Sequence, residues 1–276
     1  MAATLPHYPY SILPLQDDQW MRSVRKICKV LRPHWKVDGM QFNFLSGGYM
    51  NKTLCCLCPE SEAGENERLL FRITLIEDEQ LINRKAELEA LQLMHDHCNG
   101  SHLYCTFANG LVCSFLPGST LNPKQLADQK ISRLISNSMA SMHALAAHVA
   151  KSLYLEKTGE HYLANVMSLL VSKTINAPCD IWNRFRKLKF PLSKAQLAEE
   201  HSFCSQLCLR LKSEIVFCHN DLNMYNMIYN GQENAVHLID VEFAGLNYQA
   251  FDIANHFCEF AGILVIMEYL YGYIRS

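Results

Sequence analysis

The chain has 276 residues, of which 49% are hydrophobic and 19% are charged, and its formal net charge is −2. This composition is typical of a folded globular protein and argues against long disordered segments, and the length is sufficient for two domains or lobes. A net charge this close to zero creates no overall field that would attract nucleic acid or anionic lipid, so we expect no nucleic-acid partner.

The first residues and the cysteines bear on cellular location and metal content. The first four residues lack the basic and apolar segments of a signal peptide, so a cytoplasmic protein is predicted. The twelve cysteines fall mainly in apolar runs, which favours reduced, buried thiols. An alternative is a zinc site, although the spacing is not that of a zinc finger. Its ligands would come from Cys55, Cys58, His95, His97 and Cys98.

The N-terminal part reads as an extended arm followed by a nucleotide-binding lobe. Three prolines in residues 1–16 favour an extended arm, and apolar residues at helical spacing predict a helix over 17–31 that Pro33 ends. Strands are predicted over 42–45 and 52–58, with a glycine turn between them. The small lobe is therefore predicted to cover residues 17–116.

Several residues of this lobe are candidates for binding nucleotide. Gly47 and Gly48 would let backbone N–H groups approach phosphate, with Asn51 as a side-chain donor, although a hairpin turn needs glycine in any case. Arg72, in a strand predicted over 69–73, is the candidate cation for the phosphates. Glu87, on a helix predicted over 81–97, would pair with Arg72. Glu89 is the competing acid, and an ordinary surface ion pair is the alternative.

The second lobe is predicted to cover residues 117–276. It follows two further strands, at 103–106 and 111–115, and a hinge at Pro117 and Gly118. Apolar residues at helical spacing predict helices over 126–148, 162–170 and 197–211. His143, on the first of these helices, is expected to be a packed histidine and not a catalyst.

The most informative segment begins at His219. Between strands predicted at 215–217 and 227–229, the segment reads His-x-Asp-Leu-x-x-x-Asn, with Asp221 and Asn226 in the positions that protein kinases use for the catalytic base and a magnesium ligand. A third strand, 237–239, delivers Asp240, a second ligand candidate, and Glu242 would lie on the same face of an extended chain. The alternative is that these residues form only a turn and a cap.

Three motifs together resemble the choline/ethanolamine kinase family. They are the segment from His219 to Asn226, the Ile-Asp-x-Glu from Ile239 to Glu242, and the Asn-His-Phe-x-Glu from Asn255 to Glu259. Residues 31–35, 103–111 and 247–252 are most similar to the ethanolamine kinase branch. The similarity extends over about residues 18 to 262.

The resemblance implies an α+β, bilobal protein-kinase-like fold, with a small N-terminal antiparallel-sheet lobe and a mainly helical C-terminal lobe. It implies ATP and Mg²⁺ as cofactors and phosphorylation of ethanolamine, the first step toward phosphatidylethanolamine. Asp221, with His219, would be catalytic, and Asn226, Asp240 and Glu242 would bind metal. Glu259 and Asp252 would face the substrate's ammonium group, with a helix N-cap as the alternative for Asp252.

Members of this family continue for many tens of residues beyond the position of Gly262, whereas this chain ends at Ser276. A truncated or alternatively spliced form with an incomplete second lobe is therefore expected. Residues 263–273 are too short for a membrane span. Choline kinase activity is one alternative. Another is an impaired isoform that acts as a binding or regulatory subunit, as a homodimer or paired with a full-length form.

Overall fold

The computed structural model describes residues 5–12, 19–45, 51–61, 67–74, 84–152 and 193–260. The chain divides into two compact units, the first made of Met1–Glu79 and Leu91–Gly118 and the second of Gln80–Ala90 and Ser119–Ser276. The division falls within helix α2 (Arg84–Cys98) and again after Gly118. The lobe bounds expected from the sequence, 17–116 and 117–276, remain a prediction.

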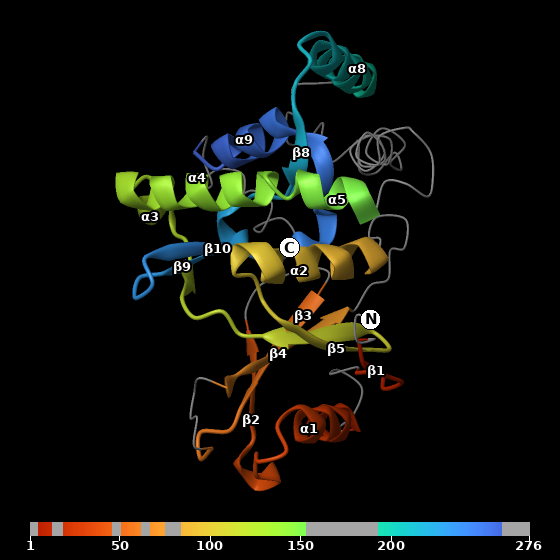
Figure 1. The fold of residues 1–276 in the computed structure, drawn as a ribbon, viewed down its shortest axis with the longest axis vertical. Helices are drawn as coiled ribbons and strands as arrows, with labels where there is room; N and C mark the ends of the chain where they lie inside the picture. Colours follow the sequence, from red (N-terminus) through yellow and green to blue (C-terminus); the bar gives the residue numbers. More distant parts are fainter. Residues whose placement is uncertain are drawn as a thin grey trace. The chain divides into compact units, whose positions relative to one another are not determined.

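The first unit is built on one six-stranded sheet with the order β1-β5-β6-β4-β3-β2 (Figure 1). Neighbouring strands are antiparallel, except that β1 runs parallel to β5. The predicted hairpin is present as β2 and β3, which pair from Gln41 opposite Leu57 to Leu45 opposite Thr53. The strands are β1 (His7–Tyr8), β2 (Gln41–Leu45), β3 (Asn51–Leu57), β4 (Leu69–Thr74), β5 (Leu103–Phe107) and β6 (Gly110–Ser114).

Helix α1 (Gln19–Leu31) packs its apolar side on this sheet. Val24, Ile27 and Cys28 are fully buried together with side chains of β3 and β4 such as Leu54 and Phe71. The helix occupies the predicted position, and it ends at Leu31, shortly before the proline, which cannot continue it. The spacing of apolar residues along the chain therefore determined how this layer forms.

The N-terminal segment is part of the same sheet. His7 and Tyr8 lie opposite Thr106 and Phe107 of β5. Ile12 is fully buried, and its backbone N–H donates to Oδ1 of Asn109 at 2.8 Å, while Asn109 Nδ2 donates back to Ile12 O at 2.8 Å. The segment predicted to be an extended arm thus contributes an edge strand and a core side chain to the first unit.

The second unit contains two small groups of strands. One is a three-stranded sheet in the order β10-β9-β7, and the other is the antiparallel pair of β11 and β8. β8, β9 and β10 correspond to the three strands predicted around the catalytic motif. The strands are β7 (Ser119–Thr120), β8 (Ile215–Cys218), β9 (Met227–Asn230), β10 (Ala235–Leu238) and β11 (Gly245–Tyr248).

The long helix predicted over 126–148 is wrong, because the chain forms three shorter helices there: α3 (Pro123–Leu126), α4 (Gln129–His143) and α5 (Ala146–Ser152). Local capping explains where α4 begins, and α4 ends at its C-cap, Ala144. The side chain of Asp128 accepts hydrogen bonds from the backbone N–H groups of Lys130 and Ile131, which starts a new helix at Gln129. The predicted segment 162–170 lies outside the described residues.

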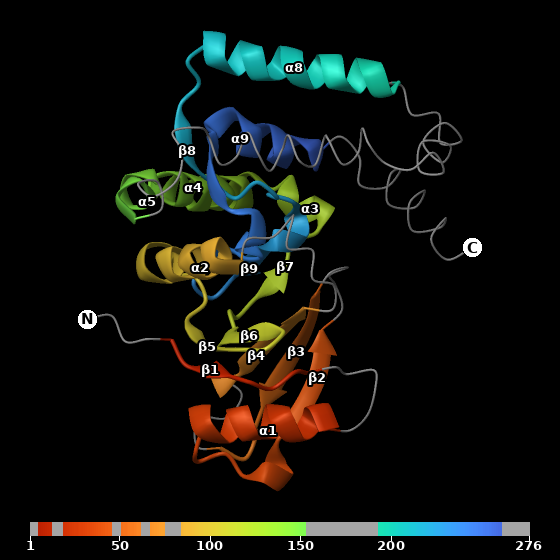
Figure 2. The same cartoon turned by 90° about the vertical axis from the view of Figure 1, so that its right-hand side faces the viewer.

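Helices of the second unit surround β8. Contacts join β8 to α4, to α5 and to α9 (Gln249–Cys258), and α4 also contacts β10 (Figures 1 and 2). The last predicted helix is present as α8 (Lys194–Arg210), which Ser193 caps. No helix in the described part of the chain is long and apolar enough to cross a membrane. Because β8 contacts both α4 and α9, the loop that follows β8 begins beside these two helices.

Candidate active site

His219 is the first residue after β8, and it is fully buried. Its Nδ1 accepts a hydrogen bond from the backbone N–H of Asp221 at 3.3 Å, and its Nε2 lies 2.8 Å from the carbonyl oxygen of Ile239. Because one ring nitrogen faces a donor and the other faces an acceptor, the proton belongs on Nε2. The imidazole thus bonds the backbone of its own loop at Asp221 and the backbone of Ile239, the residue that precedes Asp240.

Asn220 turns the chain toward Asp221. Its φ of 66° lies in the left-handed region, which asparagine tolerates better than most residues. Its side chain donates to the carbonyl oxygen of Phe243 at 2.8 Å and accepts from Asn247 Nδ2 at 2.8 Å. Both ends of the Asn220 side-chain amide are thus hydrogen-bonded, and nothing in the sequence beyond the residue type indicated this role.

The predicted base and the predicted metal ligand lie together, as expected. Nδ2 of Asn226 donates to the backbone oxygen of Asp221 at 2.8 Å and to its carboxylate Oδ2 at 2.9 Å. Since the NH₂ group faces these two acceptors, the amide orientation is fixed and Oδ1 points elsewhere. Oδ1 of Asn226 is therefore placed to act as a ligand atom.

Asp240 is delivered by the hairpin of β9 and β10. The strands pair with Leu238 opposite Met227, and the backbone N–H of Ile239 donates to the carbonyl oxygen of Asn226 at 2.9 Å. Asp240 follows directly. Its φ of 63° is left-handed, a conformation that aspartate tolerates better than most residues and that turns the chain out of β10.

Glu242 lies in a 3₁₀ turn, Val241–Phe243, that begins after Asp240. The expectation that Glu242 would share a face with Asp240 assumed an extended chain, and that assumption is wrong. The left-handed backbone of Asp240 ends the strand direction, so alternation of side chains no longer applies there.

Three residues on one face of α9 and its C-cap bind the backbone of the catalytic loop. Asp252, His256 and Glu259 are spaced i, i+4 and i+7, so they follow one another along one side of a helix. Oδ2 and Oδ1 of Asp252 accept from the backbone N–H groups of His219 and Asn220, both at 2.8 Å. His256 hydrogen-bonds the backbone of Leu222, and Oε2 of Glu259 accepts from Met224 N–H at 3.0 Å.

The contacts of Asp252 correct one of the two expectations for this residue, and its contact with the substrate remains a prediction. The N-cap of α9 is Tyr248, so Asp252 is not the cap. The carboxylate is buried, with 1% of Asp252 exposed, and both of its oxygens accept hydrogen bonds from the protein. Burial tends to raise the pKa of Asp252, but hydrogen bonds from His143, His219 and Asn220 outweigh it and lower the pKa below its ordinary value. Asp252 is therefore an ionised anchor for the loop.

The spacing of Asp252, His256 and Glu259 was the signal that could have revealed this anchor. The sequence showed the two acids but could not show that their partners are backbone amides. Burial of His256 lowers its pKa, and the hydrogen bond to Leu222 partly offsets this effect. His256, kept neutral by burial, therefore lies between Asp252 and Glu259 on the helix face that binds the loop backbone.

The predicted nucleotide-binding residues lie mainly in the first unit. Gly47 and Gly48 fall outside the described residues. Asn51 begins β3 and is buried, and Arg72 lies in β4 opposite Thr53 of β3 and Leu111 of β6.

The predicted partner of Arg72 is in the second unit. Glu87 is buried in α2 and forms an ion pair with Arg84 at 2.7 Å. Glu89, the competing acid, is paired with Lys85 at 4.0 Å. Because Arg72 and Glu87 belong to different units, their pairing remains a prediction.

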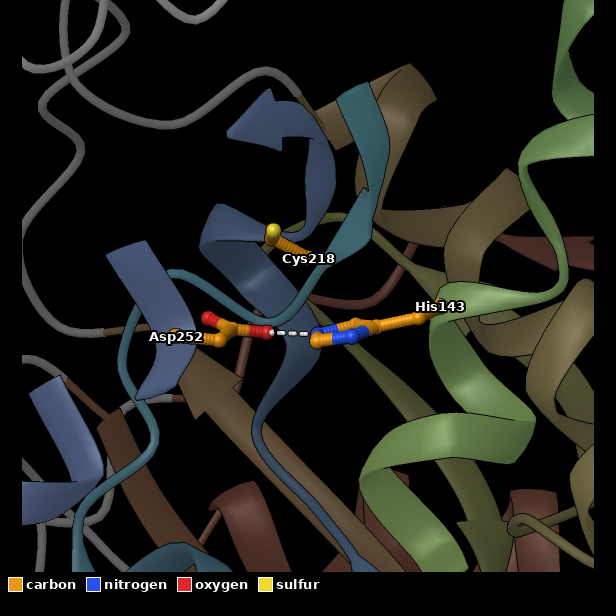
Figure 3. A group of neighbouring side chains, drawn as sticks. All are labelled: His143, Cys218 and Asp252. Carbon is orange, nitrogen blue, oxygen red and sulfur yellow. Dashed lines mark hydrogen bonds and ion pairs between the residues drawn. The ribbon is translucent and has the colours of Figure 1, made fainter. Parts of the chain in front are cut away.

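The zinc alternative finds no support in the described residues. Within them, one group of three ligand-type side chains could surround a metal, and it consists of His143, Cys218 and Asp252 (Figure 3). None of the residues considered for zinc belongs to that group. Cys55 and Cys58 are instead buried at the first unit's sheet.

Solved structures of three phosphotransferases have a similar fold. An ethanolamine kinase of Plasmodium vivax superposes with a TM-score of 0.71 at 20% identity, covering 92% of this chain and 70% of that one. A choline kinase of Cryptosporidium parvum gives a TM-score of 0.61 at 20% identity, covering 87% and 69%. A macrolide 2′-phosphotransferase gives 0.54 at 15% identity, covering 92% and 80%. The fold is thus the predicted α+β, protein-kinase-like fold of small-molecule phosphotransferases.

The sequence defines the family. The profile of choline/ethanolamine kinases matches residues 42–271. Ethanolamine kinase 1 of Mus musculus is 32% identical over 272 residues, which cover 96% of this chain and 72% of that protein. Ethanolamine kinase 1 of Homo sapiens is 34% identical, covering 96% and 58%. The chain belongs to the choline/ethanolamine kinase family, and it spans between about three fifths and three quarters of the length of these two relatives.

Proposed function

We propose that this chain transfers the γ-phosphoryl group of ATP to the hydroxyl of ethanolamine and forms phosphoethanolamine, the first step toward phosphatidylethanolamine. The observation that carries the proposal is the hydrogen-bonded pair of Asp221 and Asn226 beside the hairpin that delivers Asp240. The choice of ethanolamine rests on the relatives, which include ethanolamine kinases from Mus musculus and Homo sapiens.

Asp221 acts as the general base. Its carboxylate takes the proton from the substrate hydroxyl as the hydroxyl oxygen attacks the γ-phosphorus and the bond to the β-phosphate oxygen breaks. The hydrogen bond from Asn226 Nδ2 to Oδ2 holds the carboxylate in one orientation. His219 is buried and bonded to backbone at both ring nitrogens, so we assign it the role of shaping the loop and not of exchanging protons.

The chemistry of the donor set fits Mg²⁺. Asn226 offers Oδ1, and Asp240 and Glu242 offer carboxylate oxygens, which are the hard ligands that this ion takes in proteins together with substrate phosphates. When bound, the ion would neutralise charge on the transferring phosphates. Asn226 and Asp240 are the proposed ligands, and Glu242 would act directly or through water.

The remaining proposed contacts are with substrate and nucleotide. Glu259 uses Oε2 to bind the Met224 N–H, which leaves Oε1 for the ammonium group of the amine. Gly47, Gly48 and Asn51 are proposed to approach the phosphates of ATP, with Arg72 as the cation and Glu87 as its partner. The cytoplasmic location and association as a homodimer or with a longer form remain predictions.

The test is a phosphorylation assay with Mg-ATP and either ethanolamine or choline. Wild type is compared with Asp221→Asn, which keeps the shape of the side chain but removes the base. We expect phosphoethanolamine from wild type, a loss of kcat of roughly 100- to 10,000-fold in the variant, and no product when EDTA removes the metal.

The control substitution is Glu233→Gln, on an exposed side chain of the hairpin turn, and it should leave kcat unchanged. If choline is turned over faster than ethanolamine, choline and not ethanolamine is the phosphoryl acceptor. Equal product from wild type and Asp221→Asn would contradict it.

A further inference from the structure

His143 is buried at the last position of α4, far in sequence from the catalytic loop. Its Nε2 lies 2.9 Å from Oδ2 of Asp252, and Figure 3 shows the imidazole directed at that carboxylate. We propose that His143 is a positioning residue for phosphoryl transfer, which holds the catalytic loop through Asp252. The kinetic part of this inference rests on the function proposed above.

The contacts form a chain of three links. α4 supplies His143, α9 supplies Asp252, and the carboxylate binds the backbone N–H groups of His219 and Asn220. These two amides immediately precede Asp221, and the second belongs to the left-handed residue that turns the chain. A displacement of the Asp252 carboxylate therefore moves the backbone that carries the base.

Among the described partners of this buried carboxylate the imidazole is the strong side-chain donor, and the Cys218 thiol is a second, weak one. A buried carboxylate is costly unless donors surround it. Without His143, Oδ2 would keep the His219 N–H as its strong donor and would have only the weak Cys218 thiol nearby, so the carboxylate would shift or take up a proton. Either change weakens its hold on the two loop amides.

Cys218 completes the group in Figure 3, but the three residues do not make a metal site. Its thiol is directed at the carbonyl oxygens of Asn247 and Tyr248, with Sγ at 3.7 and 3.6 Å. Burial raises the pKa of the Cys218 thiol, and the charge of Asp252 raises it further, so the thiol stays protonated. Both oxygens of Asp252 are also occupied. The pair of His143 and Asp252 therefore acts as a structural link.

The experiment compares His143→Leu with His143→Gln in the full chain. Leucine removes the donor but fills the space, whereas glutamine retains an N–H donor of similar reach. The matched control is His237→Leu, because His237 is also buried and bonded to a carboxylate, Glu233, at 3.2 Å. Steady-state kinetics are measured together with amide hydrogen exchange of peptides covering residues 217–226.

In His143→Leu we expect kcat to fall by up to about 100-fold, with KM for ATP and ethanolamine changed by less than about threefold. Exchange at the His219 and Asn220 amides should accelerate by about tenfold or more, while peptides of the first unit keep their protection. His143→Gln should recover most of both effects. His237→Leu should keep kcat within about twofold of wild type.

Unchanged exchange at residues 219 and 220 in His143→Leu would overturn the proposal. So would a uniform rise in exchange across the second unit with no recovery in His143→Gln, because that result indicates a general packing role. If wild type phosphorylates neither ethanolamine nor choline, the proposed function fails, and hydrogen exchange still decides whether His143 holds the loop.

Discussion

Asn220 and Asp240 have left-handed backbones at the two ends of the candidate site. A β-branched or bulky residue would be strained at either position, whereas asparagine and aspartate tolerate it. The sequence identified Asp240 by its carboxylate, yet the residue also turns the chain out of β10. Asp240 therefore has two roles, the turn in the backbone and the carboxylate proposed to bind metal, and only the structure reveals the turn.

Burial also determines the chemistry of the cysteines. Burial raises the pKa of the Cys105 thiol to about 12, and nearby Cys28 adds to the effect. Burial likewise raises the pKa of Cys56, which is hydrogen-bonded to Cys28. Cys204 and Cys258 are exposed. Six of the eleven cysteines that the structure describes are buried, as the expectation of buried thiols requires.

These differences predict the order of alkylation at pH 8. Because the thiolate is the reactive form, a thiol with a pKa near 12 has only roughly one part in ten thousand in that form, so iodoacetamide should modify Cys105, Cys56 and Cys218 far more slowly than Cys204 and Cys258. Mass spectrometry of peptides over time measures the rates. In denaturant the five rates should converge, and rapid native labelling of Cys105 would contradict the prediction.

At the scale of elements, α9 binds the loop after β8 directly, and α4 is connected to it through the bond between His143 and Asp252. α9 contributes Asp252, His256 and Glu259, and α4 contributes His143. The place where α4 begins is set by Asp128, whose side chain binds two backbone N–H groups. The helix pattern of the sequence concealed this start, because apolar residues continue at helical spacing across the break. Capping thus decided the element, and periodicity alone did not.

We expect Asp128→Ala to lower the free energy of unfolding by about 0.5–2 kcal/mol, because the N–H groups of Lys130 and Ile131 would lose their acceptor. Asp128→Asn retains a side-chain oxygen and should cost much less. Urea unfolding monitored by circular dichroism measures both values. Equal stability of the alanine and asparagine variants would show that the cap contributes nothing to α4.

At the scale of the whole molecule, the chain divides into two units, and the N-terminal segment belongs to the first. Residues 7–12 reach a strand almost a hundred positions later, through strand pairing and through Asn109. Sequence patterns reflect the spacing of residues that are close along the chain, so they could not identify the strand with which this segment pairs. The segment's prolines suggested an extended conformation, and the sheet edge supplies its partner.

Ile12→Ala should therefore destabilise the protein by about 2–5 kcal/mol, because it leaves a cavity in the core of the first unit. Val30→Ala is the matched control, since Val30 is 59% exposed and its truncation should change stability by less than about 0.5 kcal/mol. Thermal and urea unfolding measure the difference. Similar small effects of the two substitutions would mean that the N-terminal segment is not held in the core.

The sequence by itself determined the family, the fold class and the strands around Asp221, because these depend on residue types at short, fixed spacings. It also placed Asn226 beside Asp221, since five positions in a loop suffice for the contact. Only the tertiary structure decided that Asp252 binds loop amides and that His143 reaches it across 109 positions. Such contacts depend on which helices pack against β8, and packing over that separation leaves no local pattern in the chain.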